Sequence, residues 1–381
     1  MASGPLYLTL LAGPVLPVPV PKPVTDAFVA AEVTESATGR TGFQLTFTLA
    51  DSSVLQTLFL LAGDSPVPVL RVALVVTWGG LPQVLFDGVI EHHEVKPDAM
   101  SGSAKLVVTG HDLSVLMDLT DLTGQVPYPG LSPDQRVEVI LARYAAFGIV
   151  PLVIPVPAPD VPVPQQRVPV HRGTDLGYIR KLAAEAGYIF CLVPGPVPGT
   201  TTAYFGPQVR VGVPQQALSV NMDAWTNVET LSFTYQPQGA VAPVVYLASP
   251  DAGVPPVPVA IPPVTPFNPP LGAVVPPPQH VRYLRGTAKR SPAEALMLGM
   301  AEVVRHADVV TGQGTLSVDR YGQVLRPRSL VGVRGAGIAF DGLHYVDSVT
   351  HTLKPGDYKQ SFVLKRNALI TNLPAVPALP Y

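Results

Sequence analysis

The chain has 381 residues, a formal net charge of -2, 47% hydrophobic residues and 14% charged residues. So apolar a chain is not disordered, and its length predicts two or three domains with a large core. The near-neutral charge argues against the clustered Lys and Arg that bind nucleic acid. No window reaches the roughly 20 unbroken apolar residues of a membrane-spanning helix. We therefore expect a soluble protein with neither nucleic-acid binding nor membrane insertion.

Cysteine usage and the first residues bear on the cellular compartment. Cys191 is the only cysteine, which excludes an internal disulfide and fits synthesis in a reducing cytoplasm. The apolar segment 6–20 lacks a basic n-region and is broken by prolines. We interpret it as a strand and a linker rather than a signal peptide.

The first segment is predicted to be mainly strand. Phe43 to Leu49 alternates apolar and polar residues, which is typical of an antiparallel strand with one buried face. Val67 to Thr77, Val84 to Val95 and Ser103 to Thr109 add further strands, with Gly, Pro and Asp between them. These strands predict a small barrel or sandwich over about residues 1–115.

The middle of the chain changes from strands to a mixed pattern. Ser132 opens a capping box with proline at the first helical position, and Thr174 caps a second helix that ends at Gly187. Tyr188 to Val193 and Thr201 to Phe205 then form a predicted hairpin. This segment is therefore a mixed α and β unit.

The last third returns to strands after an interruption. Val228 to Tyr235 alternates as a strand, and Ser291 opens a capping box for another helix before strands resume from Gly314 to Asn367. Between them, Pro237 to Pro278 is the longest of the tracts that hold the 45 prolines. Proline removes a backbone donor and is excluded from helix interiors and central strands. We expect this tract to be an extended or polyproline insertion.

A short repeat links the first and last segments. Phe86-Asp87-Gly88 and Phe340-Asp341-Gly342 each follow an apolar run broken by glycine and precede another strand. Two similar strand-rich units explain this recurrence, with chance recurrence of a short turn motif as the alternative. On the first interpretation, Phe340 to Asn367 is the closing hairpin of the second unit, equivalent to Phe86 to Thr109.

Candidate catalytic and metal-binding residues are few. In Glu91-His92-His93-Glu94 the two histidines face opposite sides of a strand, and the order differs from His-Glu-x-x-His. We interpret this run as a solvent-facing strand end. Asp118 and Asp121 could form a glycosidase couple, but isolated acids in turns are usually caps or solvated charges.

Other motifs give no site either. No Gly-x-Ser-x-Gly occurs, and Gly335-Ala336-Gly337 precedes a strand rather than a helix. We interpret His111 and His351 as structural hydrogen-bonding residues. We predict that the chain is not an enzyme, with no catalytic residues, no metal-binding residues, no cofactor-binding residues and no cofactor.

Several stretches together resemble the phage late control protein D family, which includes the baseplate hub proteins of contractile tails and related injection systems. The order and spacing of these stretches carry the resemblance, and no single one is specific. They are Phe86 to Ile90, Gly110 to Asp112, Thr174 to Phe190, Ser291 to Ala295, Val349 to His351, Gly356 to Tyr358 and Phe362 to Leu364. The tract Pro237 to Pro278 departs from the family pattern.

The strand pattern and the resemblance together predict an α+β, mainly β fold with two similar tube-like β-barrel domains and a mixed α/β domain between them. The proline-rich insertion in the second barrel is predicted from the sequence itself, because the family pattern lacks it. The expected boundaries are 1–115 for the first barrel, 116–222 for the mixed domain, 223–239 and 308–370 for the second barrel, 240–307 for the insertion with one helix, and 371–381 for a C-terminal tail.

The resemblance also implies a structural function and a set of partners. A homotrimer would present six barrels to a sixfold tail tube and threefold symmetry to a spike, among other baseplate components. Related valine-glycine repeat G proteins of type VI systems carry a fused spike. This chain ends at Tyr381 without a repeating β-helix, so we expect a separate spike protein. We expect assembly in the bacterial cytoplasm into a phage-tail-like particle.

Two alternatives stay open at this point. The chain could be a cell-wall hydrolase or carbohydrate-binding protein at a tail tip. It could also be the hub of a non-contractile tail.

Overall fold

The structure is a computed structural model, and it describes residues 6–49, 69–98, 103–157, 159, 161–237, 240–247, 255–266 and 268–371. Almost all of the expected C-terminal tail, from residue 372 onward, lies outside the described residues. The described α-helices are α1 (Lys22–Asp26), α2 (Pro133–Ala142), α3 (Asp175–Ala186), α4 (Pro292–His306) and α5 (Val318–Tyr321).

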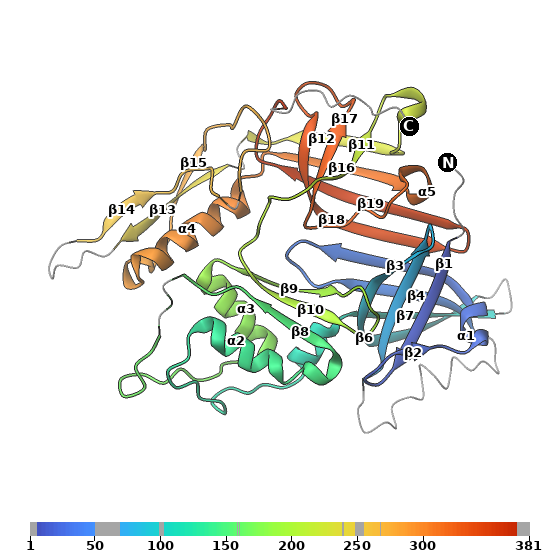
Figure 1. Cartoon of the computed structure of the whole chain (residues 1–381), viewed down its shortest axis with the longest axis horizontal. Helices are drawn as coiled ribbons and strands as arrows, with labels where there is room; N and C mark the ends of the chain where they lie inside the picture. Colours follow the sequence, from blue (N-terminus) through green and yellow to red (C-terminus); the bar gives the residue numbers. More distant parts are fainter. Residues whose placement is uncertain are drawn as a thin grey trace.

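One large sheet joins both ends of the chain (Figure 1). Its described strands are β1 (Tyr7–Gly13), β2 (Val18–Pro19), β3 (Phe28–Ser36), β4 (Gly42–Leu49), β5 (Arg71–Trp78), β6 (Leu81–Asp98), β7 (Ser103–Asp112), β11 (Gln215–Ser219), β12 (Thr230–Tyr235), β16 (Val310–Ser317), β17 (Leu330–Arg334), β18 (Gly342–Lys354) and β19 (Asp357–Arg366). The hydrogen-bonded order is β12-β16-β19-β18-β3-β4-β7-β6-β5-β1-β2, with β17 also on β18 and β11 on β17. The mainly β character agrees with the expectation from sequence.

The two halves of this sheet have the same strand order. The first half pairs β3-β4-β7-β6-β5, and the second half pairs β12-β16-β19-β18-β17. In each half the first strand pairs with the second, the second pairs with the fifth, and the fifth pairs with the fourth. This matching order supports the repeat predicted from the sequence. Among the described residues the pairing forms an open path, so two closed barrels stay a prediction.

A β-bulge in each half of the sheet shows which residues of the two copies of the repeat are equivalent. In β6 the pairing with β7 shifts between Ile90 and His92, and in β18 the pairing with β19 shifts between Val346 and Ser348. A bulge places one extra residue in one strand and fixes the local register. Ile90 therefore corresponds to Val346, and His92 corresponds to Ser348.

The motif that first indicated the repeat does not occupy equivalent places. Phe86-Asp87-Gly88 lies inside β6, where Asp87 is opposite Ala73, whereas Phe340 lies in a turn and Gly342 begins β18. The prediction that both copies open a hairpin is therefore wrong for the first copy. Asp87 is instead fixed inside the sheet by its charge partner, Arg71.

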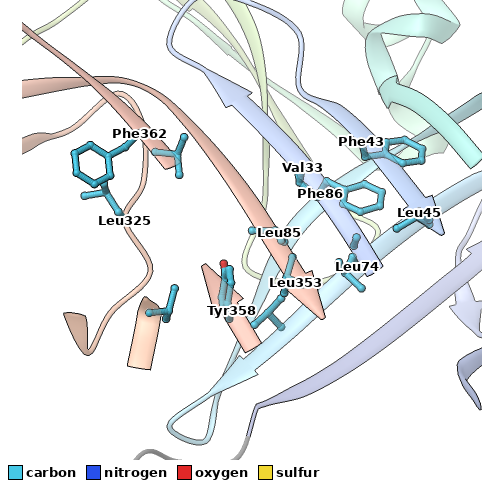
Figure 2. Close-up of a cluster of buried hydrophobic side chains, with 14 of the residues drawn as sticks. Val33, Phe43, Leu45, Leu74, Leu85, Phe86, Leu325, Leu353, Tyr358 and Phe362 are labelled. Carbon is cyan, nitrogen blue, oxygen red and sulfur yellow. The ribbon is translucent and has the colours of Figure 1, made fainter. Parts of the chain in front are cut away.

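The two halves join where β3 pairs antiparallel with β18. Ala31 lies opposite Leu353, and Val33 lies opposite His351. The side chains of Val33, Leu45, Leu353 and Phe362 belong to one hydrophobic core that continues across this junction (Figure 2). The alternating sequence of β4 explains its part in this core, because every second side chain of a strand points to the same face.

The mixed unit lies beside the first half of the sheet. It contains a three-stranded sheet in the order β8 (Ile149–Val153), β10 (Thr201–Gly206) and β9 (Ile189–Pro194), with α2 and α3 packed in one core. The predicted caps are present: Ser132 forms a capping box with Gln135, Thr174 accepts a hydrogen bond from Gly177, and Gly187 ends α3 in the left-handed conformation. The hairpin of β9 and β10 also agrees with its prediction.

The proline-rich insertion agrees only in part with the prediction of an extended or polyproline segment, because 261–266 and 268–278 belong to no helix or strand but 241–247 and 257–260 are strands. It forms a second three-stranded sheet, β14 (Val257–Ala260), β13 (Val241–Leu247) and β15 (His280–Tyr283), which packs against α4. Pro258 lies on an edge strand. Pro243 lies opposite Arg282 of β15 and next to the end of the β14 pairing, where its carbonyl accepts a hydrogen bond from the Ile261 N–H. Proline is tolerated where its missing N–H faces no ladder partner. Figure 1 shows this unit projecting from the rest of the molecule.

A buried ion pair within β5 and β6 provides a test of the fold. The Arg71 guanidinium donates two hydrogen bonds to Asp87, of 2.7 and 2.6 Å, and both side chains are almost fully buried. Asp87→Ala would leave a buried charge whose remaining described partner is the Val15 carbonyl. We expect a loss of about 3–5 kcal/mol in the free energy of unfolding, measured by urea denaturation.

The matched control for this variant is an exposed pair on the same strand. Glu94 lies 3.0 Å from Lys96, and more than half of each side chain is exposed. Glu94→Ala should change the free energy of unfolding by no more than about 1 kcal/mol. Equal losses in the two variants would contradict the assignment of Asp87 as a buried structural charge.

Candidate functional site

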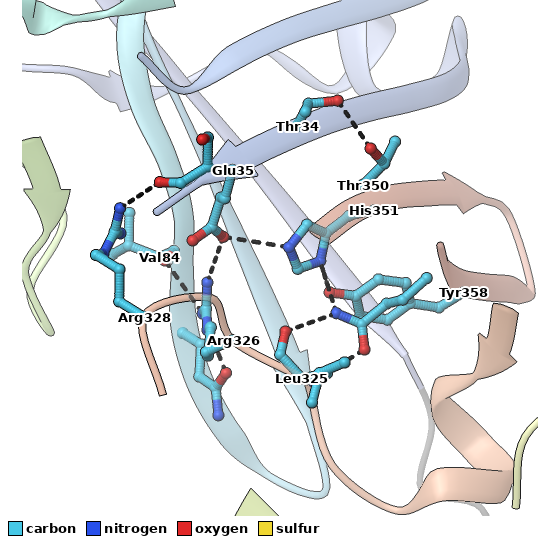
Figure 3. Close-up of polar contacts among 12 residues, drawn as sticks. Thr34, Glu35, Val84, Leu325, Arg326, Arg328, Thr350, His351 and Tyr358 are labelled. Atoms are coloured by element: carbon cyan, nitrogen blue, oxygen red, sulfur yellow. Dashed lines mark hydrogen bonds and ion pairs between the residues drawn. The ribbon is translucent and has the colours of Figure 1, made fainter. Parts of the chain in front are cut away.

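A buried polar network lies at the junction of the two sheet halves (Figure 3). Glu35 of β3 and His351 of β18 are both almost fully buried, and His351 Nε2 lies 3.2 Å from Glu35 Oε1. On its other side, His351 Nδ1 lies 2.8 Å from the Tyr358 hydroxyl and 3.1 Å from Gln360 Nε2. Both neighbours can donate to Nδ1, so the neutral ring carries its proton on Nε2, the nitrogen that lies nearest Glu35.

Two arginines from the loop before β17 extend this network into the first half. Arg326 donates to Glu35 Oε1 at 2.8 Å and to Gln83 Oε1 at 3.2 Å. Arg328 donates to the Ser36 carbonyl at 2.7 Å. Because the donors lie in the second half and the acceptors in the first, these contacts hold the two halves at one relative position.

The charges in the network follow from burial and from the arginines. Burial would raise the pKa of Glu35, but the hydrogen bond with His351 and the positive charge of Arg326 outweigh it and lower the pKa to about 2. Burial lowers the pKa of His351 more than its contact with Glu35 raises it. Glu35 is therefore ionised and His351 neutral at neutral pH, so the junction holds one buried carboxylate matched by the arginines.

The sequence prediction that His351 is a structural hydrogen-bonding residue agrees with this network. Glu35 and Arg326 were missed, and so was the strand β3 itself. One signal was present: Glu35 continues the alternation of Ala31 and Val33, so its carboxylate occupies a core position. A carboxylate at such a position requires a partner.

The Glu91-His92-His93-Glu94 run lies in the second part of β6. Glu91 Oε2 contacts His111 Nδ1 on the neighbouring strand β7. His92 and His93 are exposed at successive positions of the strand, as predicted from their spacing. Within the described ranges, no group of three or more His, Cys, Asp or Glu side chains is arranged to hold a metal ion.

Asp118 and Asp121 both act as hydrogen-bond acceptors in turns. Asp118 accepts from Thr174 at 2.7 Å and from Arg40 at 2.6 Å, and these two contacts lower its pKa. Asp121 accepts from the Thr123 backbone N–H at 2.8 Å, and hydrogen bonds from the side chain and then the backbone of Thr123 lower its pKa. A glycosidase general acid needs a raised pKa, so neither carboxyl is suited to that role.

An open pocket of about 1010 Å³ lies between the mixed unit and the start of α4. Its lining combines apolar residues between β8 and α3, among them Val156, Val161, Val163 and Val168, with charged side chains. These charged side chains are Arg136, Arg167, Arg172, Lys181, Glu185, Arg290 and Glu294. The described lining holds no cysteine or histidine, and its serine, Ser291, forms the capping box of α4 with Glu294, in which its Oγ accepts from the Glu294 N–H.

Three further side chains, those of Cys191, Lys359 and Lys365, are either buried or hydrogen-bonded within the chain. Cys191 is buried, and burial raises the pKa of its thiol. Lys359 donates to Glu229 at 2.8 Å, and Lys365 donates to Thr311 at 3.1 Å. Among the helices that the structure describes, none is long and apolar enough to cross a membrane.

The buried network predicts that the contribution of the β3–β18 junction to the free energy of unfolding depends on pH. The pKa of Glu35 is lower in the folded protein than the roughly 4.3 of an unfolded chain. The stabilisation of the folded state by ionised Glu35 is therefore complete above that value and is lost as the pH falls towards 2. Glu35→Gln should lower the free energy of unfolding by about 1–3 kcal/mol near neutral pH. This difference should shrink in acid, measured by urea denaturation at several pH values.

The control for this variant is Glu32→Gln. Glu32 lies on the same strand but on its exposed face. We expect a change within about 0.5 kcal/mol at every pH. A constant difference between the wild type and Glu35→Gln from neutral pH to strong acid would contradict the assigned role of Glu35.

Known proteins match this chain in their fold but not at the level of sequence families. No protein-family model and no curated protein matches the chain. Among solved structures, the tail protein from Neisseria meningitidis MC58 aligns with a TM-score of 0.60 at 13% identity over 96% of this chain and 97% of that chain. The 43 kDa tail protein of prophage MuSo2 from Shewanella oneidensis aligns with a TM-score of 0.60 at 14% identity over 96% and 99%.

A third match comes from a secretion system. The E. coli c3393 protein is a component of the type VI secretion system that is structurally similar to the T4 bacteriophage tail proteins gp27 and gp5. It aligns with a TM-score of 0.52 at 14% identity over 93% of this chain and 78% of that chain. This chain therefore has the fold of phage tail proteins and of a type VI secretion component.

Proposed function

We propose that the chain is a structural baseplate hub of a phage tail or contractile injection system. In this role it forms a homotrimer that adapts a sixfold tail tube to a threefold spike. The observation that carries the proposal is the matching strand order of the two halves of one sheet. The fold shared with phage tail proteins over nearly the whole chain supports it.

The symmetry argument starts from the repeat. A chain that carries the same strand arrangement twice offers two similar surfaces, and three such chains offer six. The rest of the chain occurs once, so three chains offer three copies of the mixed unit and of the insertion. In the proposed trimer, the sixfold set matches the tube and the threefold set matches the spike.

The repeat also defines the proposed domains. Residues 1–115 form the first tube-like barrel, and 223–239 with 308–370 form the second. The mixed domain, 116–222, and the insertion, 240–307, lie between the strands of these barrels. The proposed partners are a tail tube protein, a separate spike protein and other baseplate components, in a phage-tail-like particle assembled in the bacterial cytoplasm.

The proposed role needs no catalysis, cofactor or metal. The solved structures named above are of tail proteins and a secretion-system component, which supports a structural role. The alternative of a cell-wall hydrolase would need Asp118 or Asp121 as a general acid. The lowered pKa of each carboxyl argues against that role.

The oligomeric state tests the proposal. At micromolar concentration, light scattering after size exclusion should give about three times the 40.2 kDa chain mass. A stable hub interface should bury well above roughly 1,000 Å². The trimer should therefore persist on dilution, and it should capture tube or spike protein made from neighbouring genes.

The Glu35→Gln variant serves as the control, because its change lies inside one chain. It should lower stability while leaving the mass of the folded particle unchanged. A monomeric mass for the wild type at every concentration, together with no capture of tube or spike protein, would count decisively against the hub.

A further inference from the structure

Each half of the sheet has a first strand and a fourth strand that can pair with another half. The β3–β18 junction pairs the first strand of one half with the fourth strand of the other, and the equivalent pair remains. The strand equivalent to β3 in the second half is β12, and the strand equivalent to β18 in the first half is β6. Inside the chain β3 pairs with β18. Among the described strands, β12 pairs only with β16, and the part of β6 beyond Ile90 pairs only with β7.

Both of these edges are less buried than their equivalents, although Leu231 and Phe233 of β12 are half-buried. Residues 91–97 of β6 are all exposed, whereas their equivalents in β18 include the buried Val349, His351 and Leu353. On β12, Tyr235 is 40% exposed, whereas its equivalent in β3, Glu35, is 2% exposed. The same pair of strand positions is thus joined once inside the chain, at β3 and β18, and is left without a described partner at β12 and at the part of β6 beyond Ile90.

Strand pairing fixes which residues correspond. Val33 lies opposite Phe43 of β4, and Phe233 lies opposite Gly312 of β16, at the same place in the two halves. On the other edge, the aligned bulges make Val95 the equivalent of His351. Because Val33 lies opposite His351 in the junction, the equivalent contact joins Phe233 to Val95.

We propose that β6 of one copy pairs antiparallel with β12 of a second copy of this chain, with Val95 opposite Phe233 and Glu94 opposite Thr234. This inference rests on the proposed hub function and deepens it by identifying the surface through which the copies meet. The paired segments are residues 92–97 of β6 and 231–236 of β12.

The side chains on these edges suit such a contact. The face that continues the core carries His93, Val95 and Pro97 on one edge, and Leu231, Phe233 and Tyr235 on the other. Pairing would bury these apolar and aromatic groups and complete the backbone hydrogen bonds of both strands. The contact between copies would thus be held by apolar burial where the internal junction uses Glu35 and His351.

The opposite face carries charge that protects the free edge before assembly. Glu91, Glu94 and Lys96 lie on the β6 edge, and Pro97 removes one backbone donor. Charged residues and proline on an edge strand disfavour indiscriminate pairing. Since these charges face away from the core, a correctly registered partner need not bury them.

The two edges lie in different halves of the sheet, so the contact is head to tail. Such a heterologous contact either closes into a ring or continues as a filament. With the internal junction and the contact between copies alternating, three chains would place six similar strand sets around one axis.

Cysteine cross-linking tests the register. Inside the chain, the hydroxyl oxygens of Thr34 and Thr350 are 3.0 Å apart, which is close enough for a disulfide at that pair. Their equivalents are Thr234 and Glu94. In a Cys191→Ala background, Glu94→Cys with Thr234→Cys should give covalent dimers and trimers after oxidation, seen on a non-reducing gel and lost on reduction.

Two matched controls accompany this variant. Thr34→Cys with Thr350→Cys should form an internal disulfide at the mobility of a single chain. His92→Cys with Thr230→Cys uses the same strands and faces but lies six residues, roughly 20 Å, out of register, so it should give no cross-link. If the double variant folds poorly, single Glu94→Cys and Thr234→Cys chains are mixed, and a covalent dimer without larger species is expected.

The outcomes separate the two proposals. A trimer by light scattering that gives no cross-link between positions 94 and 234 overturns the edge pairing and leaves the hub function standing. A monomer at every concentration overturns both. Cross-linking by the out-of-register pair as strong as that by the in-register pair also overturns the proposed register.

Discussion

The pairing of β3 with β18 is the constraint on which the rest of the sheet depends. It turns two sets of strands with the same order into one continuous sheet, and it lets one hydrophobic core run through both. Without it, the backbone donors and acceptors of β3 and β18 that face the junction would have no partners, and Val33 and Leu353 would become more exposed. The junction therefore stabilises the fold of one chain, and it is the model for the proposed contact between chains.

The polar network adds specificity to this pairing. Apolar strands can slip by two residues and still bury the same face, but Glu35 can meet His351 and Arg326 in one register only. A buried carboxylate is costly when unpaired, so the misaligned arrangements are penalised more than the correct one is favoured. The network thus sets the alignment of the halves, while apolar burial supplies most of the stability.

Local features of the sequence predicted local structure well. The ends of α2 and α3 follow from Ser132, Thr174 and Gly187 because caps depend on a few neighbouring residues. The strands β13 and β14 were missed because each contains a proline, and β3 was missed because His351, the partner of its buried Glu35, lies far away in the chain. Pro243 and Pro258 become acceptable once their place relative to the partner strands is known.

The insertion separates β12 from β16 in the second half, whereas a short turn joins the equivalent strands β3 and β4 in the first half. The two copies of the repeat are therefore alike in their strands and different in what they carry. In a ring of the proposed kind, this projecting sheet and its helix α4 would stand at every second position around the circumference. The insertion in this one hairpin would then divide six similar positions into two alternating sets of three. A neighbouring protein could bind one set and not the other by contacting the insertion.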